Sequence, residues 1–183
     1  MSVRMGSEEL LERVESALSD YTPRKIEQPA AAAAAVLILL HPKSGEPHVI
    51  FTERTNHVEH HKGQMSFPGG ACDDTDDCSE TTALRETWEE IGVKKDHVRL
   101  IGSLDDMVTI SNFRVTPFVA VLEYENPYPY AINDHEVAKV VEVPLAFLME
   151  EENMELEVRE HQRLEPFGER GQCDERGDAT DGD

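Results

Sequence analysis

Basic residues are scarce in this chain of 183 residues, where 17 Lys and Arg stand against 38 Asp and Glu and the formal net charge is −21. A protein that binds the phosphate backbone of nucleic acid needs a basic surface. Nucleic acid is therefore not an expected partner. An anionic small molecule would need a metal ion or a few local cations to be held.

Cysteine is equally scarce, with three residues, Cys72, Cys78 and Cys173, and no CxxC pair. This excludes a disulfide framework and a structural zinc site, and it favours a reducing compartment. The longest apolar run, residues 30–40, is too short to span a bilayer. The N-terminus also shows no basic segment followed by an apolar one, as a signal peptide would. We expect a cytoplasmic protein that does not bind a membrane.

Composition and the positions of proline and glycine divide the chain into three segments. Residues 1–29 contain a short amphipathic helix over 7–20 and a proline-containing connector. Residues 30–165 form the expected domain, and the polar, glycine-rich segment 166–183 is expected to be disordered. Within the domain, we predict strands at 33–41, 46–54, 97–104, 113–124 and 139–143, the first two as a hairpin, with a further candidate at 154–160. A loop is predicted over 55–70, and a short helix enters through Pro144.

An acidic loop at 73–77 precedes a helix with clear start and stop signals. Asp77 and Glu80 have the spacing of a capping box, and Gly92 is placed to end the helix. At about 100° per residue, Leu84, Trp88 and Ile91 form an apolar stripe that we expect to face the core.

Three glutamates, Glu86, Glu89 and Glu90, lie on the opposite side of this helix, and Arg85 borders them. Like charges on adjacent turns repel by about 0.2–0.5 kcal/mol per pair. Spacing alone is compatible with a solvated acidic face. It is equally compatible with a site for a hard divalent cation, which prefers oxygen ligands.

The stretch 69–93 resembles the signature of the Nudix hydrolases, G-x5-E-x7-R-E-U-x-E-E-x-G-U, where U is aliphatic. "RETWEEIGV" matches the second half, with Thr87 at one aliphatic position. In the first half, the spacing from Gly70 to Arg85 is one residue longer, and Asp76 or Asp77 replaces the glutamate. Of these two aspartates, Asp77 has the signature's distance to Arg85.

A second motif, at residues 50–70, is similar to that of Nudix coenzyme A pyrophosphatases, L-L-T-x-R-S-x3-R-x3-G-x3-F-P-G-G. Glu59 stands where that motif has its second arginine. The resemblance extends over residues 33–150. The residues in register are Thr52, Arg54, Gly63, Phe67, Pro68, Gly69 and Gly70.

The resemblance implies an α/β fold of the α/β/α sandwich type with a mixed β-sheet. It also implies metal-dependent hydrolysis of the diphosphate bond of coenzyme A or acyl-coenzyme A, giving 3′,5′-ADP and 4′-phosphopantetheine or its acyl derivative. Glu59 favours an alternative small-molecule substrate, such as ADP-ribose, NADH or an oxidised nucleotide. A silent Nudix-fold nucleotide sensor is a further alternative, against which the intact glutamates speak.

By the same resemblance, Glu86 and Glu90 would bind Mg²⁺ or Mn²⁺, with Glu89 as a third ligand or the general base. A backbone carbonyl of Gly69 or Gly70 would join them. Arg85 would orient a carboxylate.

The remaining candidates lie outside the helix. Glu136 is the candidate for a further acid from a later loop, with Asp105 and Asp106 as rivals. We expect Arg54 to contact a substrate phosphate, and the loop that carries Gly63, Phe67 and Gly70 to contact the substrate. The sequence leaves open whether the chain forms a homodimer.

Overall fold

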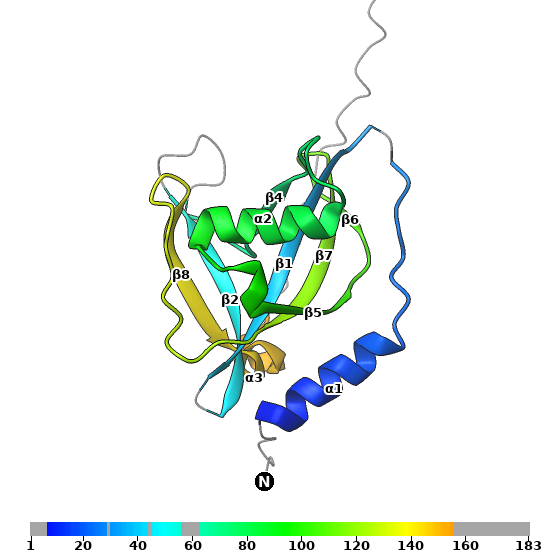
Figure 1. Cartoon of the computed structure of the whole chain (residues 1–183). Helices are drawn as coiled ribbons and strands as arrows, with labels where there is room; N and C mark the ends of the chain where they lie inside the picture. The colour runs from blue at the N-terminus through cyan, green and yellow to red at the C-terminus, as the bar shows by residue number, and fades with distance from the viewer. Residues whose placement is uncertain (1–6, 29, 44, 56–62, 156–183) are drawn as a thin grey trace, which may run out of the picture.

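The computed structural model describes residues 7–28, 30–43, 45–55 and 63–155 (Figure 1). The helices are α1 Ser7–Ser19, α2 Ser79–Ile91 and α3 Leu145–Met149, with 3-10 turns at Lys95–His97 and Glu151–Asn153. The strands are β1 Ala32–Lys43, β2 Glu46–Arg54, β3 Met65–Ser66, β4 Gly69–Ala71, β5 Val98–Ser103, β6 Met107–Val108, β7 Phe113–Leu122 and β8 Val137–Pro144.

All of these strands belong to one mixed sheet. Its main order is β3-β2-β1-β7-β5, with β4 paired to β1, β6 to β7 and β8 to β2. The β1–β7 pair is parallel and the other pairs are antiparallel. The predicted β1–β2 hairpin is confirmed, with Leu40 opposite Val49.

Helices cover both faces of the sheet, which confirms the predicted α/β/α sandwich. Side chains of a strand point alternately to the two faces, and β1 is apolar on both: Leu37 and Leu39 enter one core, Leu40 the other. The larger core is shared with Ala83 and Ile91 of α2, which lies across the front of the sheet in Figure 1. The smaller core is covered from the opposite face by α1 and α3, through Leu11, Val14, Leu18, Leu145 and Leu148.

The alanine run of β1 is explained by close backbone packing. Ala34 and Ala35 lie opposite Ala71 and Gly70 of β4, and Ala35 is fully buried in the core beneath α2. A Cβ at Gly69 would lie 2.3 Å from the Ala35 carbonyl oxygen, closer than real Cβ atoms approach. Small residues on β1 and β4 therefore let α2 and the Gly69–Gly70 backbone come close together.

The segment predicted as a loop over 55–70 carries two strands in its described part, β3 and β4. "GGA" has almost no intrinsic preference for a strand, and β4 forms because β1 offers it an edge. Sheet pairing outweighs local propensity there. The candidate strand at 154–160 and the segment 166–183 lie mostly or wholly outside the described residues. Among the described helices, none is both long and apolar enough to cross a membrane.

Candidate active site

The ends of α2 fix the position of its acidic side chains. The helix starts after Cys78, which makes no side-chain cap hydrogen bond, so the predicted Asp77 cap is wrong. The predicted stop at Gly92 is confirmed: φ is 72°, a left-handed conformation that glycine adopts without strain, and its N–H donates to the Trp88 carbonyl. A Cβ at Gly92 would also lie 2.6 Å from the Cβ of Ala131, so a following loop packs directly on the helix end.

The buried face of α2 differs from the predicted apolar stripe. Trp88 is 56% exposed, so its assignment to the core is wrong. Glu90, expected to face away from the core with the other glutamates, is 3% exposed. The buried stripe instead runs through Thr82, Ala83, Thr87, Glu90 and Ile91. A carboxylate thus enters the protein interior, where an unpaired charge is costly.

Arg85 organises the neighbouring acids. Its Nε and Nη2 donate to both carboxylate oxygens of Asp76 at 2.9 Å, and its Nη1 donates to Glu86 at 2.8 Å and Glu89 at 2.9 Å. Nη2 also donates to the Ala71 carbonyl oxygen at 3.2 Å. All five guanidinium donors are therefore used to hold the loop and the helix together.

Asp76, and not Asp77, takes the place of the signature glutamate. Its side chain is 4% exposed and also accepts hydrogen bonds from the Thr82 hydroxyl and the Asp73 N–H. The Arg85 guanidinium holds the pKa of Asp76 far below its usual range. Asp77 is exposed. Asp76 keeps the signature's distance from Gly70, and the extra residue lies between Asp76 and Arg85, so counting back from Arg85 selects the wrong aspartate.

Glu90 is an acid with few partners. Its Oε2 accepts one hydrogen bond, from the Gly69 N–H at 3.2 Å. Burial raises the pKa of Glu90 to about 7; the charges of Glu86 and Glu136 add to this shift, and Arg54 opposes it. A side chain of this kind gains a proton, or a cation, at little cost near neutral pH.

Glu86 lies against bare backbone. A Cβ at Gly70 would be 2.5 Å from its carboxyl carbon and 2.7 Å from both its oxygens. Burial raises the pKa of Glu86, although Arg85 opposes the shift. The missing side chain at Gly70 thus allows a carboxylate to sit beside the β4 main chain.

Glu136 reaches the same region from the loop that leads into β8. The N–H of Ala131 donates to the Ile91 carbonyl at 3.0 Å, and the N–H of Asn133 donates to the Glu90 carbonyl at 2.9 Å. These bonds satisfy carbonyls that the helix end would otherwise leave free. Asn133 Nδ2 then donates to Glu136 at 3.3 Å. The loop is therefore fixed to α2, and Glu136 with it.

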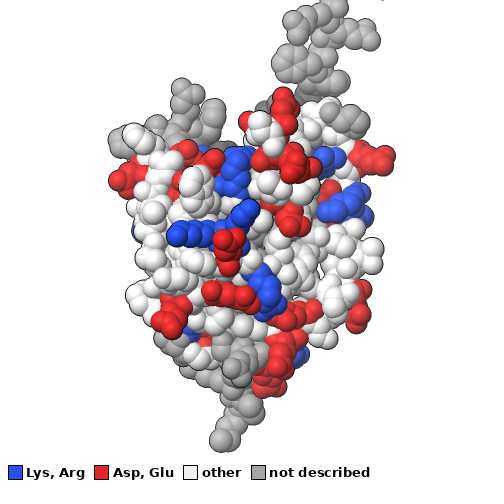
Figure 2. All heavy atoms as spheres, viewed as in Figure 1, with Lys and Arg blue, Asp and Glu red and all other residues white. Residues whose placement is uncertain are grey.

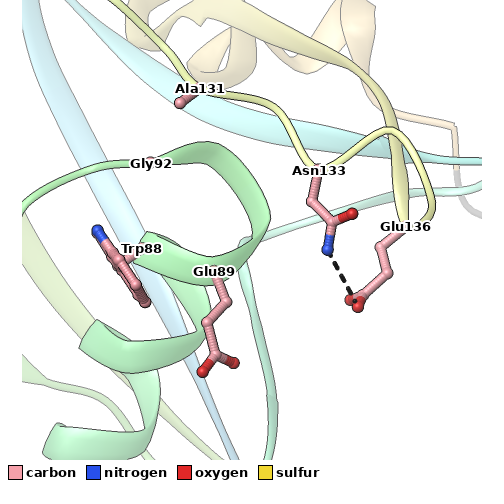
Figure 3. A pocket seen from close by; sticks show the side chains of 6 residues that line it. All are labelled: Trp88, Glu89, Gly92, Ala131, Asn133 and Glu136. Atoms are coloured by element: carbon pink, nitrogen blue, oxygen red, sulfur yellow. Dashed lines mark hydrogen bonds between the residues drawn. The ribbon is translucent and has the colours of Figure 1, made fainter.

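A pocket of about 470 Å³ lies between the end of α2 and this loop (Figure 3). Trp88 and Glu89 come from the helix, and Asn133 and Glu136 from the loop. Gly92 and Ala131 complete the lining. Glu89 and Glu136 are thus brought to one cavity, although they are far apart in sequence.

Arg54, at the end of β2, is the candidate cation of the site. It lies close enough to Glu90 for its charge to lower the pKa of that carboxyl. Its buried Nε has no hydrogen-bond partner among the described residues. A buried donor without an acceptor is costly, and an anionic ligand would supply one.

The remaining predicted residues are placed as follows. Gly63, with φ of 66°, donates its N–H to the Arg54 carbonyl, and so lies beside the candidate cation. Phe67 stacks on Phe51, with ring centroids 4.9 Å apart, and packs against the smaller core. That packing accounts for the aromatic side chain at this position; its contact with substrate stays a prediction. Glu59 lies outside the described residues.

Asp105 and Asp106, the rivals of Glu136, hold the connector between α1 and β1. Asp105 accepts hydrogen bonds from the Tyr21 hydroxyl and the Arg24 N–H. Asp106 accepts from Lys25, from the Ile26 N–H and from Thr116. Their bonds give both aspartates a structural role.

The donor set suits a hard divalent ion, with carboxylates of Glu86, Glu89 and Glu90 and main-chain carbonyls of β4 in one neighbourhood. Over the described residues, no three Asp, Glu, His or Cys side chains are already gathered as a metal site. Arg85 instead pairs with Glu86 and Glu89, and Glu90 accepts from Gly69. The incompletely paired Glu90, and the Glu86 carboxylate packed against the main chain of Gly70, nevertheless fit such an ion.

The surface around α2 is mixed in charge. Figure 2 shows acidic side chains in separate groups with Lys and Arg between them, and no continuous negative surface on this face. The net charge of −21 therefore does not by itself keep an anionic ligand away from the site.

Sequence comparison identifies the class of protein to which this fold and this helix belong. The profile of the NUDIX domain matches residues 31–165, and the chain belongs to the NUDIX domain family. NudL of Escherichia coli strain K12, an uncharacterised Nudix hydrolase, is 39% identical over 113 residues. The protein of the same name in Escherichia fergusonii has the same identity. The match covers 62% of this chain and 57% of those relatives' length.

Solved structures agree with the fold. A binary complex of the Caenorhabditis elegans Ap4A hydrolase gives a TM-score of 0.53 at 21% identity, over 62% of this chain and 80% of the other. The NUDIX domain of Shewanella oneidensis NrtR, complexed with ADP ribose, gives 0.52 at 21% identity, over 73% and 84%. At this identity the similarity concerns the fold.

Sequence reasoning missed three residues of the pocket, Trp88, Ala131 and Asn133. Trp88 was assigned to the core from its type, although it lies about 130° around the helix from the middle of the buried stripe. Asn133 carries no motif, and only its position three residues before Glu136 points to it.

Proposed function

We propose that this protein hydrolyses the diphosphate bond of coenzyme A or an acyl-coenzyme A in a reaction that depends on Mg²⁺ or Mn²⁺. The products would be 3′,5′-ADP and 4′-phosphopantetheine or its acyl derivative. The observation that carries the proposal is that the α2 carboxylates lie near Glu136 and near Arg54, whose buried Nε has no hydrogen-bond partner in the described part of the chain. Such a site can hold a cation and a phosphate together.

The α2 carboxylates would hold the metal. Glu86 and Glu90 are the proposed main ligands, with a β4 carbonyl from Gly69 or Gly70, because these oxygens lie together and Glu90 has few other partners. When bound, the ion supplies positive charge that polarises phosphate oxygens and promotes the ionisation of water. Arg85 would keep Glu86 and Glu89 in place through the hydrogen bonds that it already makes.

The acids of the pocket would handle the proton of the attacking water. In the reaction, a water oxygen bonds to one phosphorus, the bridging P–O bond breaks, and a carboxylate takes the water's proton. Glu89 and Glu136 line the same pocket from opposite elements, and we propose Glu89 as base or third ligand and Glu136 as the further acid. Arg54 would donate to a phosphate oxygen of the substrate, which satisfies its buried Nε.

The tandem motif at residues 50–70 supports coenzyme A as the substrate. A specific observation favours a second candidate. Glu59 reverses the charge of the arginine in that motif. Another nucleoside diphosphate derivative, such as ADP-ribose or NADH, is the second candidate.

The test is product release from coenzyme A, acetyl-coenzyme A, ADP-ribose and NADH, each with Mg²⁺, Mn²⁺ or EDTA. Glu90→Gln removes the proposed ligand, and Glu80→Gln, an exposed acid in the first turn of α2, is the matched control. We expect metal-dependent release of 3′,5′-ADP from coenzyme A that is lost in Glu90→Gln and kept in the control. Cleavage of ADP-ribose or NADH, without cleavage of coenzyme A, would keep the diphosphatase reaction and reject coenzyme A as the substrate. Turnover of none of the four compounds would favour a nucleotide sensor.

A further inference from the structure

Trp88 is the only tryptophan of the chain, and the structure leaves it 56% exposed. A large apolar side chain in solvent forgoes the gain from burial and is therefore informative. Neither of the two cores includes this indole. It lies at the pocket beside Glu89, on the helix that carries the proposed metal ligands (Figure 3).

The part of the pocket next to the indole is lined by small side chains on a rigidly held backbone. Gly92 and Ala131 contribute at most a methyl group, and they pack so closely that a Cβ at Gly92 would lie 2.6 Å from that of Ala131. Hydrogen bonds from Ala131 and Asn133 to the last carbonyls of α2 hold this wall in place. The indole therefore borders a preformed space of about 470 Å³, within the usual size of small-molecule sites.

The charges around the space restrict its occupant. Glu89 and Glu136 also line the pocket, so a protein partner that covered the indole would desolvate two carboxylates. A flat aromatic ring of a small ligand can cover the indole alone and leave the acids to the polar part of the same molecule. A nucleotide has this division between an aromatic base and a charged diphosphate.

We propose that Trp88 is the platform on which the nucleobase of the substrate stacks. This inference rests on the proposed function, because it assigns the base end of the same ligand. Stacking on an aromatic side chain accepts any base, since every base has a π face. Discrimination between bases would then fall to the polar groups of the pocket, with Asn133 able to donate and to accept.

Intrinsic fluorescence tests the platform without turnover, because the emission of a single tryptophan reports this site alone. We expect saturable quenching by AMP and ADP-ribose, in EDTA as well as in Mg²⁺, and none by ribose 5-phosphate or pyrophosphate, which lack a base. Quenching by pyrophosphate equal to that by AMP would overturn the proposal. So would the absence of quenching by any base-containing ligand.

Steady-state kinetics provide a second test of the proposed stacking on Trp88. Trp88→Ala should raise KM for the substrate by about 5- to 140-fold, the worth of one base stack, with kcat little changed, and Trp88→Phe should restore most of the affinity. Phe147→Ala is the matched control: Phe147 is 51% exposed on α3, which packs on the opposite face of the sheet. Circular dichroism checks that each variant is folded.

The outcomes separate the two proposals. If the wild type turns over a substrate and Trp88→Ala leaves KM unchanged, the proposal that the nucleobase stacks on Trp88 is wrong, and the proposed hydrolase function is kept. If no substrate is turned over, the proposed function fails, and the quenching experiment still decides the platform. A change of oligomeric state in Trp88→Ala with unchanged KM would make the indole an interface residue and overturn the proposal.

Discussion

Replacing Glu90 by Gln should stabilise the metal-free protein at pH 8, although it removes a proposed metal ligand. The carboxyl is 3% exposed, and its pKa is raised from 4.5 to about 7, mainly by burial. A charged carboxylate is thus forced into the interior above neutral pH. A neutral amide of the same shape avoids that cost.

The size and pH window follow from proton linkage. Below pH 4.5 the carboxyl is protonated in both the folded and the unfolded chain, so it costs nothing. Between pH 4.5 and about 7 the unfolded chain loses the proton first, so the free energy of unfolding falls as pH rises. A difference of about 2.5 in pKa corresponds to about 3 kcal/mol. For a chain of this size that is about 6–12 °C in Tm.

The assay is thermal and urea unfolding in EDTA at pH 4, 6 and 8 for the wild type, Glu90→Gln and Glu80→Gln. Glu90→Gln should equal the wild type at pH 4 and exceed it by about 3 kcal/mol at pH 8, and Glu80→Gln should follow the wild type throughout. Mg²⁺ or Mn²⁺ should stabilise the wild type at pH 8 and should stabilise Glu90→Gln much less, because the variant binds the ion more weakly. A Glu90→Gln variant less stable than the wild type at pH 8 would refute the reasoning.

Five further variants test the supports of the site. Asp76→Asn, which weakens the pair with its arginine, should lower activity by about 10- to 100-fold, whereas Asp77→Asn should leave it unchanged; equal effects in the turnover assay would contradict this assignment. Gly70→Ala should weaken metal affinity in calorimetry with little loss of stability, because its methyl group would displace only the Glu86 side chain. Gly69→Ala should lower the free energy of unfolding by about 1–3 kcal/mol or more in urea unfolding, because its methyl group would meet backbone atoms at a φ of 148°. The reverse pattern would be contrary to the packing described. Asp106→Ala should lower the free energy of unfolding by about 1–3 kcal/mol by leaving the Thr116 hydroxyl unpaired and keep KM; a changed KM would give this aspartate a role in the site.

Much of the fold could be predicted because the apolar pattern agrees with the structure over the longest elements. The run from Val36 to Leu40 has no polar face, and β1 indeed buries both of its faces between two helical layers. The short strands could not be predicted in this way. Gly69 and Gly70 form β4 through pairing partners that are distant in the sequence, and no local preference reveals them.

The acidic helix shows where residue type misleads. The prediction placed the core side of α2 at Leu84 and Trp88, the most apolar residues. The buried stripe is rotated by about 100° toward Ala83, Thr87 and Glu90. Small and polar residues face the sheet because β4 approaches closely there, and the indole is left to the pocket. Such a rotation depends on what the rest of the fold places against the helix.

The position of Glu136 depended on a tertiary contact in the same way. The sequence offered it beside Asp105 and Asp106, and nothing local separates the three. Backbone hydrogen bonds from the loop to the end of α2 bring Glu136 to the pocket. The two aspartates instead accept hydrogen bonds from the connector between α1 and β1.

Binding of Mn²⁺, measured by isothermal calorimetry on the full chain at pH 8, tests the central claim most directly. We predict saturable binding to the wild type and to Glu80→Gln, weakened at least about tenfold in Glu86→Gln and in Glu90→Gln because each loses a ligand oxygen. Equal Mn²⁺ affinity in all four proteins would contradict the account, since the carboxylates of α2 would then not form the metal site.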